Sequence, residues 1–203
     1  MNVSVRSSSS APTPVRSPST SLDDLVKRAE ALQPLLLKNC AESERQRRAV
    51  EENIEAITKA GLFRLMVPRR YGGFEGTLKS HLEVSAALGE ACGGTAWVVA
   101  LTNVCAWFAG LFAKQAQDDV FRSNPDARIA GVFAPSFETR RVPGGLVTSG
   151  KWYTSSGILH ADWALVGVAE QDQHEESGRA PGASMRDGAQ WSDVGRGTTL
   201  DRR

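Results

Sequence analysis

The chain changes from helical to strand-like sequence patterns at Asn124-Pro125, and this change limits the folds that are open to it. Before this point, apolar residues recur at intervals of three and four, as on a helix face that packs against a core. After it come short stretches rich in Val, Ile, Phe and Trp, separated by turn residues. Segregated helices and strands favour an α+β fold over alternating βαβ units. We therefore predict an all-α domain over residues 21–123 and the start of a β domain over residues 124–169.

The first part of the chain carries helix start and stop signals. Ser21 and Asp24 fit a capping box, and Pro34 is expected to kink or divide the helix that follows. A second, charged helix is expected from about Ser43 to Ala60, with Gly61 ending it in the left-handed conformation.

Two further helices are expected before the change of pattern. Thr77 caps a third helix, which ends near residues 92–94 and on which His81 is expected to be exposed or partly buried. Its inward-facing residues are predicted to be Leu78, Leu82 and Leu88. Thr95 then begins a strongly apolar helix, which we interpret as fully buried, and a short amphipathic helix covers residues 114–122.

The strand predictions cover residues 128–134, 138–142, 145–149 and 163–169, with a turn at Pro143-Gly144.

Two segments lack the apolar residues that a packed core requires. Residues 1–20 are dominated by Ser and Pro, which favours a disordered leader over a transit peptide. In residues 170–203 the aliphatic β-branched and leucine residues are only Val194 and Leu200. This tail is therefore expected to be disordered or aberrant: a frameshift or truncation is favoured, and a natural charged tail is the alternative.

Overall charge and cysteine spacing narrow the function classes. The chain has 24 basic and 23 acidic side chains, which gives no electrostatic reason to expect nucleic acid or a membrane as a partner. The cysteines Cys40, Cys92 and Cys105 show no CxxC spacing, so neither a zinc site nor a disulfide framework is indicated. Unpaired cysteines are typical of a reducing compartment, and we predict a cytoplasmic protein.

Three motifs occur in a fixed order. They are GLFRLMVPRRYGG at residues 61–73, LGEACGGTAWV at residues 88–98, and VPGGLVTSGKWYTSSG at residues 142–157, the last followed by HADW. Together they resemble the acyl-CoA dehydrogenase-like flavin-dependent monooxygenases, specifically the oxygenase components of two-component systems. The resemblance covers roughly residues 22–169.

This resemblance implies a fold and an activity. Such proteins have an α-helical N-terminal domain, a β-barrel-like middle domain and a C-terminal four-helix bundle, and the bundle is absent from this chain. The implied reaction is hydroxylation of an aromatic or similar apolar substrate through a C4a-hydroperoxyflavin. The implied cofactor is reduced FMN or FAD delivered by a separate flavin reductase, and full-length relatives are expected to be homotetramers.

The resemblance also implies cofactor-binding residues. Ser155 and Ser156 are placed to donate to the N5 region of the flavin, while Trp152 and Trp97 could form walls for its ring. Without the resemblance, the serines would be turn residues and both tryptophans core residues. Where some relatives place a histidine near the flavin, this chain has Cys105, whose neutral thiol is a poor replacement for an imidazole donor. The catalytic residues stay unknown, and no metal site is expected.

Other interpretations of the sequence differ in the chemistry that they imply. A FAD-dependent acyl-CoA dehydrogenase is one alternative, but residues 131–138 lack the Leu-Thr-Glu-Pro-type motif of those enzymes. A non-catalytic fragment or helical interaction module is another. A Ser-His-Asp triad using His160 and Asp162 is rejected because the residues are too close in sequence and no nucleophile elbow is present. Arg69 and Arg70 could contact a flavin phosphate, but solvent exposure is favoured.

Overall fold

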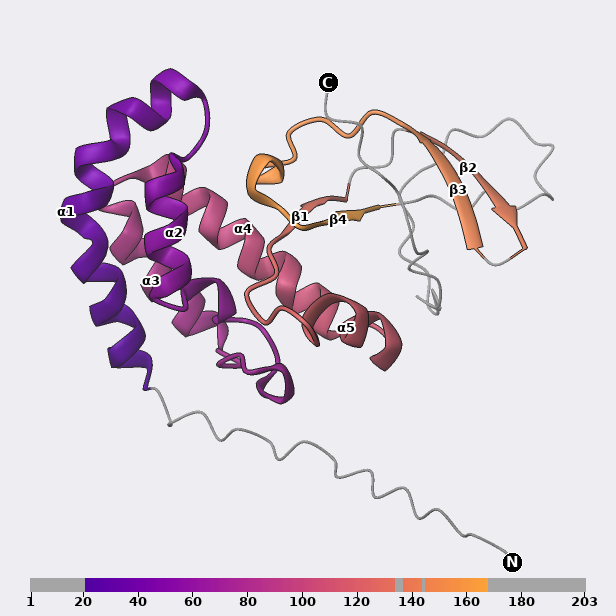
Figure 1. Cartoon of the computed structure of the whole chain (residues 1–203), viewed down its shortest axis with the longest axis horizontal. Helices are drawn as coiled ribbons and strands as arrows, with labels where there is room; N and C mark the ends of the chain where they lie inside the picture. Colours follow the sequence, from indigo (N-terminus) through magenta and orange to yellow (C-terminus); the bar gives the residue numbers. More distant parts are fainter. Residues whose placement is uncertain (1–20, 134–136, 144, 168–203) are drawn as a thin grey trace, which may run out of the picture.

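The computed structural model describes residues 21–133, 137–143 and 145–167, with helices gathered in one group and strands beside them (Figure 1). The predicted leader and tail lie outside the described residues. The α+β class is confirmed, since the helices all precede the strands. The division into domains at the bounds given above stays a prediction.

The described residues form five α-helices, three short 3-10 turns and four strands. The α-helices are α1 (Leu22–Gln46), α2 (Glu51–Lys59), α3 (Leu78–Gly89), α4 (Gly93–Gly110) and α5 (Lys114–Phe121). The 3-10 turns are η1 (Leu62–Arg64), η2 (Arg69–Tyr71) and η3 (Ile158–His160). The strands are β1 (Ile129–Val132), β2 (Phe137–Val142), β3 (Gly145–Gly150) and β4 (Trp163–Val166).

The first helix begins as predicted and ends later than predicted. Both bonds of the capping box between Ser21 and Asp24 form, and α1 runs through Pro34 without a break. The prediction that a second helix starts near Ser43 is wrong, because Ser43 lies inside α1 and its hydroxyl donates to the Asn39 carbonyl. The helix ends at Arg47, whose φ of 54° is left-handed, and α2 starts only at Glu51.

The phase of α3 also differs from the prediction. Thr77 caps the helix as expected. However, Leu78 and Leu82 are 69% and 59% exposed, so only Leu88 of the three predicted leucines faces inward. The face that packs inward carries His81 and Val84 instead, and His81 is buried where we expected exposure or partial burial. The buried face of α3 is made largely of small or polar residues, among them Ser80 and Ala87, so a prediction from the leucines alone selects the wrong face.

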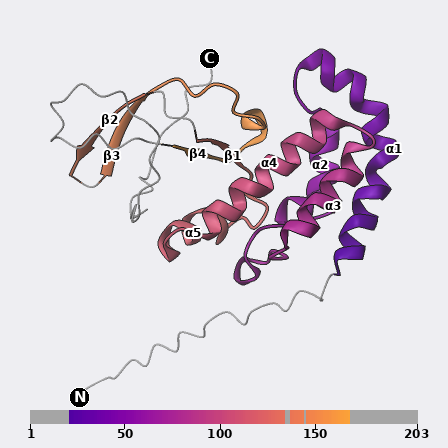
Figure 2. The ribbon, with the colours of Figure 1, turned by 180° about the vertical axis from the view of Figure 1, so that it is seen from behind.

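The apolar helix α4 is central but only half covered. It begins at Gly93, two residues before the predicted Thr95, which is itself fully buried. The prediction of a fully buried helix is wrong, since Trp97 is 59% and Trp107 is 44% exposed. Figure 2 shows α3 and α4 lying side by side with α1 beyond them, which accounts for the buried side of α4. Within the part of the chain that the structure describes, no helix is long and apolar enough to cross a membrane.

Two apolar clusters hold these elements together. The larger one joins α1, α2, η1, α3 and α4, and its largest fully buried side chains include Phe63, Leu36, Ile54, Ile57 and Leu88. The smaller one joins α4 to α5 and β1, through Val67, Cys105, Phe121 and Ile129. The strands are thus anchored to the helices through β1.

The predicted apolar connector forms η1 and η2 between α2 and α3. Gly61 ends α2 with a φ of 75°, as the sequence predicts. The chain then folds back so closely that a Cβ at Gly73 would lie 2.0 Å from the Val67 carbonyl oxygen. Only glycine fits there, because any side chain would overlap backbone atoms.

The four predicted strands all form, in two separate pairs among the described residues. Strands β1 and β4 are parallel, with Ile129 opposite Trp163, while β2 and β3 form an antiparallel hairpin. The hairpin stands away from the helices in both views (Figures 1 and 2). Only the β1–β4 pair is therefore placed to support a site beside α4.

Candidate functional site

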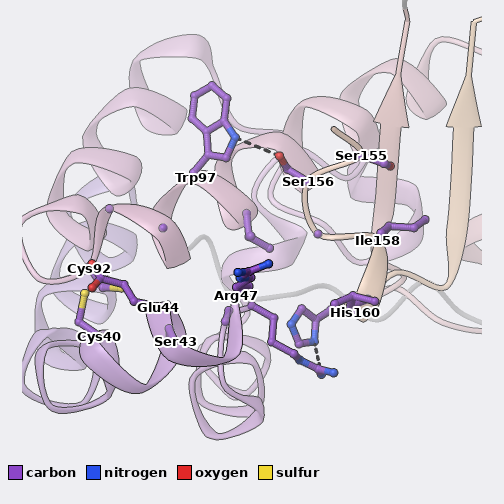
Figure 3. A pocket seen from close by; sticks show the side chains of 17 residues that line it. Cys40, Ser43, Glu44, Arg47, Cys92, Trp97, Ser155, Ser156, Ile158 and His160 are labelled. Carbon is purple, nitrogen blue, oxygen red and sulfur yellow. Dashed lines mark hydrogen bonds between the residues drawn. The ribbon is translucent and has the colours of Figure 1, made fainter. Parts of the chain in front are cut away.

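A cavity of about 600 Å³ opens where the helices meet the loop that follows β3. Its walls come from the end of α1 and the turn after it, the start of α4, and residues 155–160 (Figure 3). Ligand pockets for small molecules span roughly 300–1,000 Å³, so the cavity is of suitable size.

Three of the four predicted cofactor-binding residues lie together in this wall. Trp97 donates a hydrogen bond from its indole Nε1 to Ser156 Oγ at 3.2 Å, although the two residues are 59 positions apart. Ser155 lines the same edge (Figure 3). Trp152 does not belong to the wall; it is half-buried on the segment between β3 and η3. Their role toward a cofactor stays a prediction.

Gly157 allows the serine loop to approach α4. Its φ is 83°, which favours glycine, and an added Cβ would lie 3.2 Å from Val98 Cγ1 on the helix. This close approach sets the distance between Trp97 and Ser156. We therefore expect the pairing of Trp97 with Ser156 to be sensitive to substitution of Gly157.

His160 closes the cavity on the side of α2. Its Nδ1 lies 3.4 Å from Arg48 and 3.4 Å from the Glu51 carboxylate. Burial lowers the pKa of His160, and the Arg48 cation adds to this effect, so the imidazole is neutral near pH 7. Its Nε2 is buried without a hydrogen-bond partner among the described residues.

The contacts of Asp162 also argue against a Ser-His-Asp triad at His160. The Asp162 carboxylate accepts from the Arg128 backbone amide instead of orienting His160. Arg48 and Glu51 could not be predicted from the sequence, because nothing in their local pattern marks them as neighbours of His160.

Two cysteines lie at the other end of the cavity. Cys92 is the N-cap of α4, and Cys40 faces it from α1 (Figure 3). Cys92 Sγ accepts a hydrogen bond from Thr95 Oγ1 at 3.3 Å, and the neighbouring Cys40 thiol helps to lower the pKa of Cys92. The proximity of the two cysteines was not predicted, because their spacing in the sequence carries no recognised motif.

Cys105 lies outside the cavity wall, against β1. A Cβ added at Gly131 would lie 2.5 Å from Cys105 Sγ, so the sulfur fills the space that a side chain at 131 would need. Burial raises the pKa of this thiol to about 11, which keeps it neutral. Cys105, which the sequence predicts to be a poor hydrogen-bond donor, is therefore also tightly packed.

The Arg69–Arg70 pair is exposed, as favoured from the sequence. The Arg70 guanidinium lies 5.3 Å from the centre of the Tyr71 ring and bonds to Gln117. Neither arginine lines the cavity. In the described ranges, no group of three or more His, Cys, Asp or Glu side chains could hold a metal ion.

Comparison with known proteins defines the class. Residues 28–121 match the family described as "Acyl-CoA dehydrogenase, N-terminal domain". The chain is 35% identical over 142 residues to the flavin-dependent monooxygenase oxygenase subunit HsaA of Rhodococcus jostii, covering 70% of this chain and 37% of that protein. It is 33% identical to the p-hydroxyphenylacetate 3-hydroxylase oxygenase component of Acinetobacter baumannii, covering 79% of this chain and 38% of that protein.

A solved structure has the same fold at similar identity. XiaF from Streptomyces, in complex with FADH2 and glycerol, superposes with a TM-score of 0.70 and 35% identity, covering 72% of this chain and 37% of that one. The fold is thus that of an acyl-CoA dehydrogenase-type N-terminal region with adjoining strands. More particularly, the chain is similar to part of the acyl-CoA dehydrogenase-like flavin-dependent monooxygenase oxygenase components. It spans well under half the length of the relatives it matches, 37% of the first.

Proposed function

We propose that the protein to which this chain belongs is the oxygenase component of a two-component flavin-dependent monooxygenase. Its substrate would be an aromatic or similar apolar compound. The similarity to two oxygenase components, at 35% and 33% identity, supports this proposal. The observation that carries it in the structure is the meeting of Trp97 and Ser156 at the mouth of the cavity.

Reduced FMN or FAD fits the residues present at this edge. A flavin ring needs a flat apolar wall and hydrogen-bond donors at its polar rim. The indole of Trp97 is 59% exposed and offers such a wall, and Ser155 and Ser156 supply hydroxyls beside it. When bound, the reduced flavin would supply the reaction with dioxygen. Trp152 stays a predicted ring neighbour, although it lies outside the cavity wall.

The Trp97–Ser156 bond fixes which way the serine hydroxyl can act. An indole nitrogen only donates, so Ser156 Oγ must be the acceptor of this bond. The hydroxyl hydrogen of Ser156 is then left to donate to a ligand atom. Trp97 therefore acts on Ser156 as a positioning residue and on the ligand as a wall.

The flavin source, the assembly and the location are properties of the whole protein. A separate flavin reductase is proposed as the source of reduced flavin, a homotetramer as the assembly, and the cytoplasm as the location. The relatives named as oxygenase components support the reductase, since an oxygenase component implies a second component.

The test is anaerobic titration of the protein with reduced FMN and reduced FAD, followed by flavin absorbance. We expect stoichiometric binding, weakened about tenfold by Ser156→Ala, which is roughly the value of one hydrogen bond. Trp97→Phe keeps the wall and loses the N–H, so it should weaken binding to a similar or smaller extent. Trp107→Phe, an exposed tryptophan on the same helix outside the cavity wall, is the matched control. Absence of binding, or an equal effect of Trp107→Phe, would overturn the proposed site.

A second candidate is a FAD-dependent acyl-CoA dehydrogenase, because residues 28–121 match the N-terminal domain named for those enzymes. Anaerobic reduction of bound FAD by an acyl-CoA would favour it over the oxygenase. If neither flavin binds the protein, the third reading, a non-catalytic helical interaction module, is favoured instead.

A further inference from the structure

The floor of the cavity holds two thiols in contact with each other. Cys40 lies on α1 and Cys92 at the start of α4, and Figure 3 shows their side chains turned toward one another. The two thiols also interact electrostatically, and this interaction raises the pKa of Cys40 and lowers that of Cys92. Neither residue is in a disulfide. The two thiols therefore lie next to each other on the cavity floor.

The surroundings of Cys92 favour its thiolate. Burial alone would raise the pKa of this thiol, but hydrogen bonds from the Thr95 hydroxyl, the Cys40 thiol and the amides of Thr95 and Gly94 lower it below its ordinary value. These amides are the unpaired donors at the N-terminus of an 18-residue helix, whose dipole also favours negative charge. A thiolate in such surroundings is the nucleophilic form of cysteine.

Cys40 has the opposite character. Its hydrogen bond to Cys92 and its burial raise the pKa of the Cys40 thiol to about 11, so it keeps its proton. It is half-buried in the cavity wall, whereas Cys105 is fully buried in another cluster. The chain thus has an activated thiol, a neighbouring thiol that can resolve it, and a third thiol that serves as an internal comparison.

We propose that Cys92 and Cys40 form a modification site for peroxide, which converts the two thiols into a disulfide that links α1 to the start of α4. This proposal rests on the cavity floor and does not depend on the proposed monooxygenase activity. The oxidant is hydrogen peroxide or an alkyl hydroperoxide, small enough to enter the cavity.

The reaction balances in two steps. The Cys92 thiolate attacks one peroxide oxygen, so that an S–O bond forms and the O–O bond breaks; hydroxide leaves from hydrogen peroxide, or alkoxide from an alkyl hydroperoxide, and takes up a proton. The sulfur is oxidised by two electrons and the peroxide is reduced by two. The Cys40 sulfur then attacks Cys92; the S–S bond forms, the S–O bond breaks, and hydroxide leaves as water with the Cys40 proton.

The test uses the whole 203-residue chain treated with hydrogen peroxide at pH 7.5 and then alkylated. We expect free thiols to fall from three to one, with Cys105 retained, and a non-reducing digest to contain the Cys40–Cys92 peptide pair. Cys40→Ser should leave Cys92 as a sulfenic acid that dimedone traps. Cys92→Ser should slow the oxidation of Cys40 at least tenfold. Retention of a native circular dichroism spectrum is required of each variant.

A variant that keeps both sulfurs provides the independent control. Thr95→Val removes the hydroxyl that donates to Cys92 while keeping the side-chain shape, so thiol loss should slow severalfold. Three results would overturn the proposal: loss of Cys105 at the same rate as Cys92, oxidation of Cys40 at an unchanged rate in Cys92→Ser, or thiol loss without the linked peptide pair.

Discussion

The helices between residues 22 and 121 and the strands between residues 129 and 166 are built in different ways. The helical region encloses its own core, in which Phe63, Ile54 and Ile57 are at most 1% exposed. Among the described residues of the strand region, the buried apolar side chains are Ile129 and Ala130 of β1, and large side chains such as Phe133, Tyr153 and Leu159 are exposed. Burial on this scale supplies most of the folding free energy, so the helical region should fold by itself and the strand region should depend on it.

The largest expected effect is a loss of stability on substitution in the core of the helical region. Phe63→Ala removes a side chain that is 1% exposed and should cost about 3–5 kcal/mol of unfolding free energy. Phe133→Ala, the matched change in the strand region, removes a ring that is 48% exposed and should cost about 1 kcal/mol or less. Urea denaturation followed by circular dichroism measures both. Similar costs for the two variants would contradict the difference between the regions.

The junction between the regions should show an intermediate effect. Gly157→Ala places a methyl group at a φ of 83° and 3.2 Å from Val98 Cγ1, and should cost about 1–2 kcal/mol. It should also alter Trp97 fluorescence, because the serine loop is pushed away from α4. Gly93→Ala is the matched control: it meets no atom within 4 Å and should change stability by less than about 0.5 kcal/mol. Unchanged stability in Gly157→Ala would show that the loop adapts freely.

The smallest expected effect is a pH dependence of the stability, which arises from one buried histidine in the helical region and one at the junction. Burial lowers the pKa of His81 in the helical region, and burial with the Arg48 cation lowers that of His160 at the junction. The unfolded chain therefore binds more protons below about pH 6.5, and stability should fall as the pH drops below that value. The Glu51 carboxylate opposes the shift at His160.

His81→Gln should for this reason flatten the pH dependence more than His160→Gln. Denaturation midpoints between pH 7.5 and pH 5.5 provide the measurement. A stability that stays constant over this range in the unmodified chain would be inconsistent with two buried neutral histidines.

The sequence predicted best what is decided locally. The capping box at Ser21, the helix cap at Thr77, the end of α2 at Gly61 and the positions of the four strands depend on neighbouring residues, and the described residues confirm them. The prediction of the inward face of α3 was wrong, because whether Leu82 or His81 faces inward depends on how α3 packs against α1 and α4.

The site was predictable only in part. The family resemblance singled out Trp97, Ser155 and Ser156 as candidate cofactor-binding residues, and all three line one edge of the cavity. The pairing of Cys40 with Cys92, and of His160 with Arg48, was not predictable, since each joins residues from elements far apart in the chain. The parallel pairing of β1 with β4 was missed for the same reason.

The packing of Cys105 against Gly131 has a consequence for how this lineage can vary. Because the sulfur already occupies the place of a side chain at 131, the two positions cannot be altered independently. A larger residue at either one becomes tolerable only after the other has changed or the strand has moved. Substitutions at these two sites should therefore show strong epistasis, and a route from Cys105 to a bulkier hydrogen-bonding residue should pass through a rearrangement of β1.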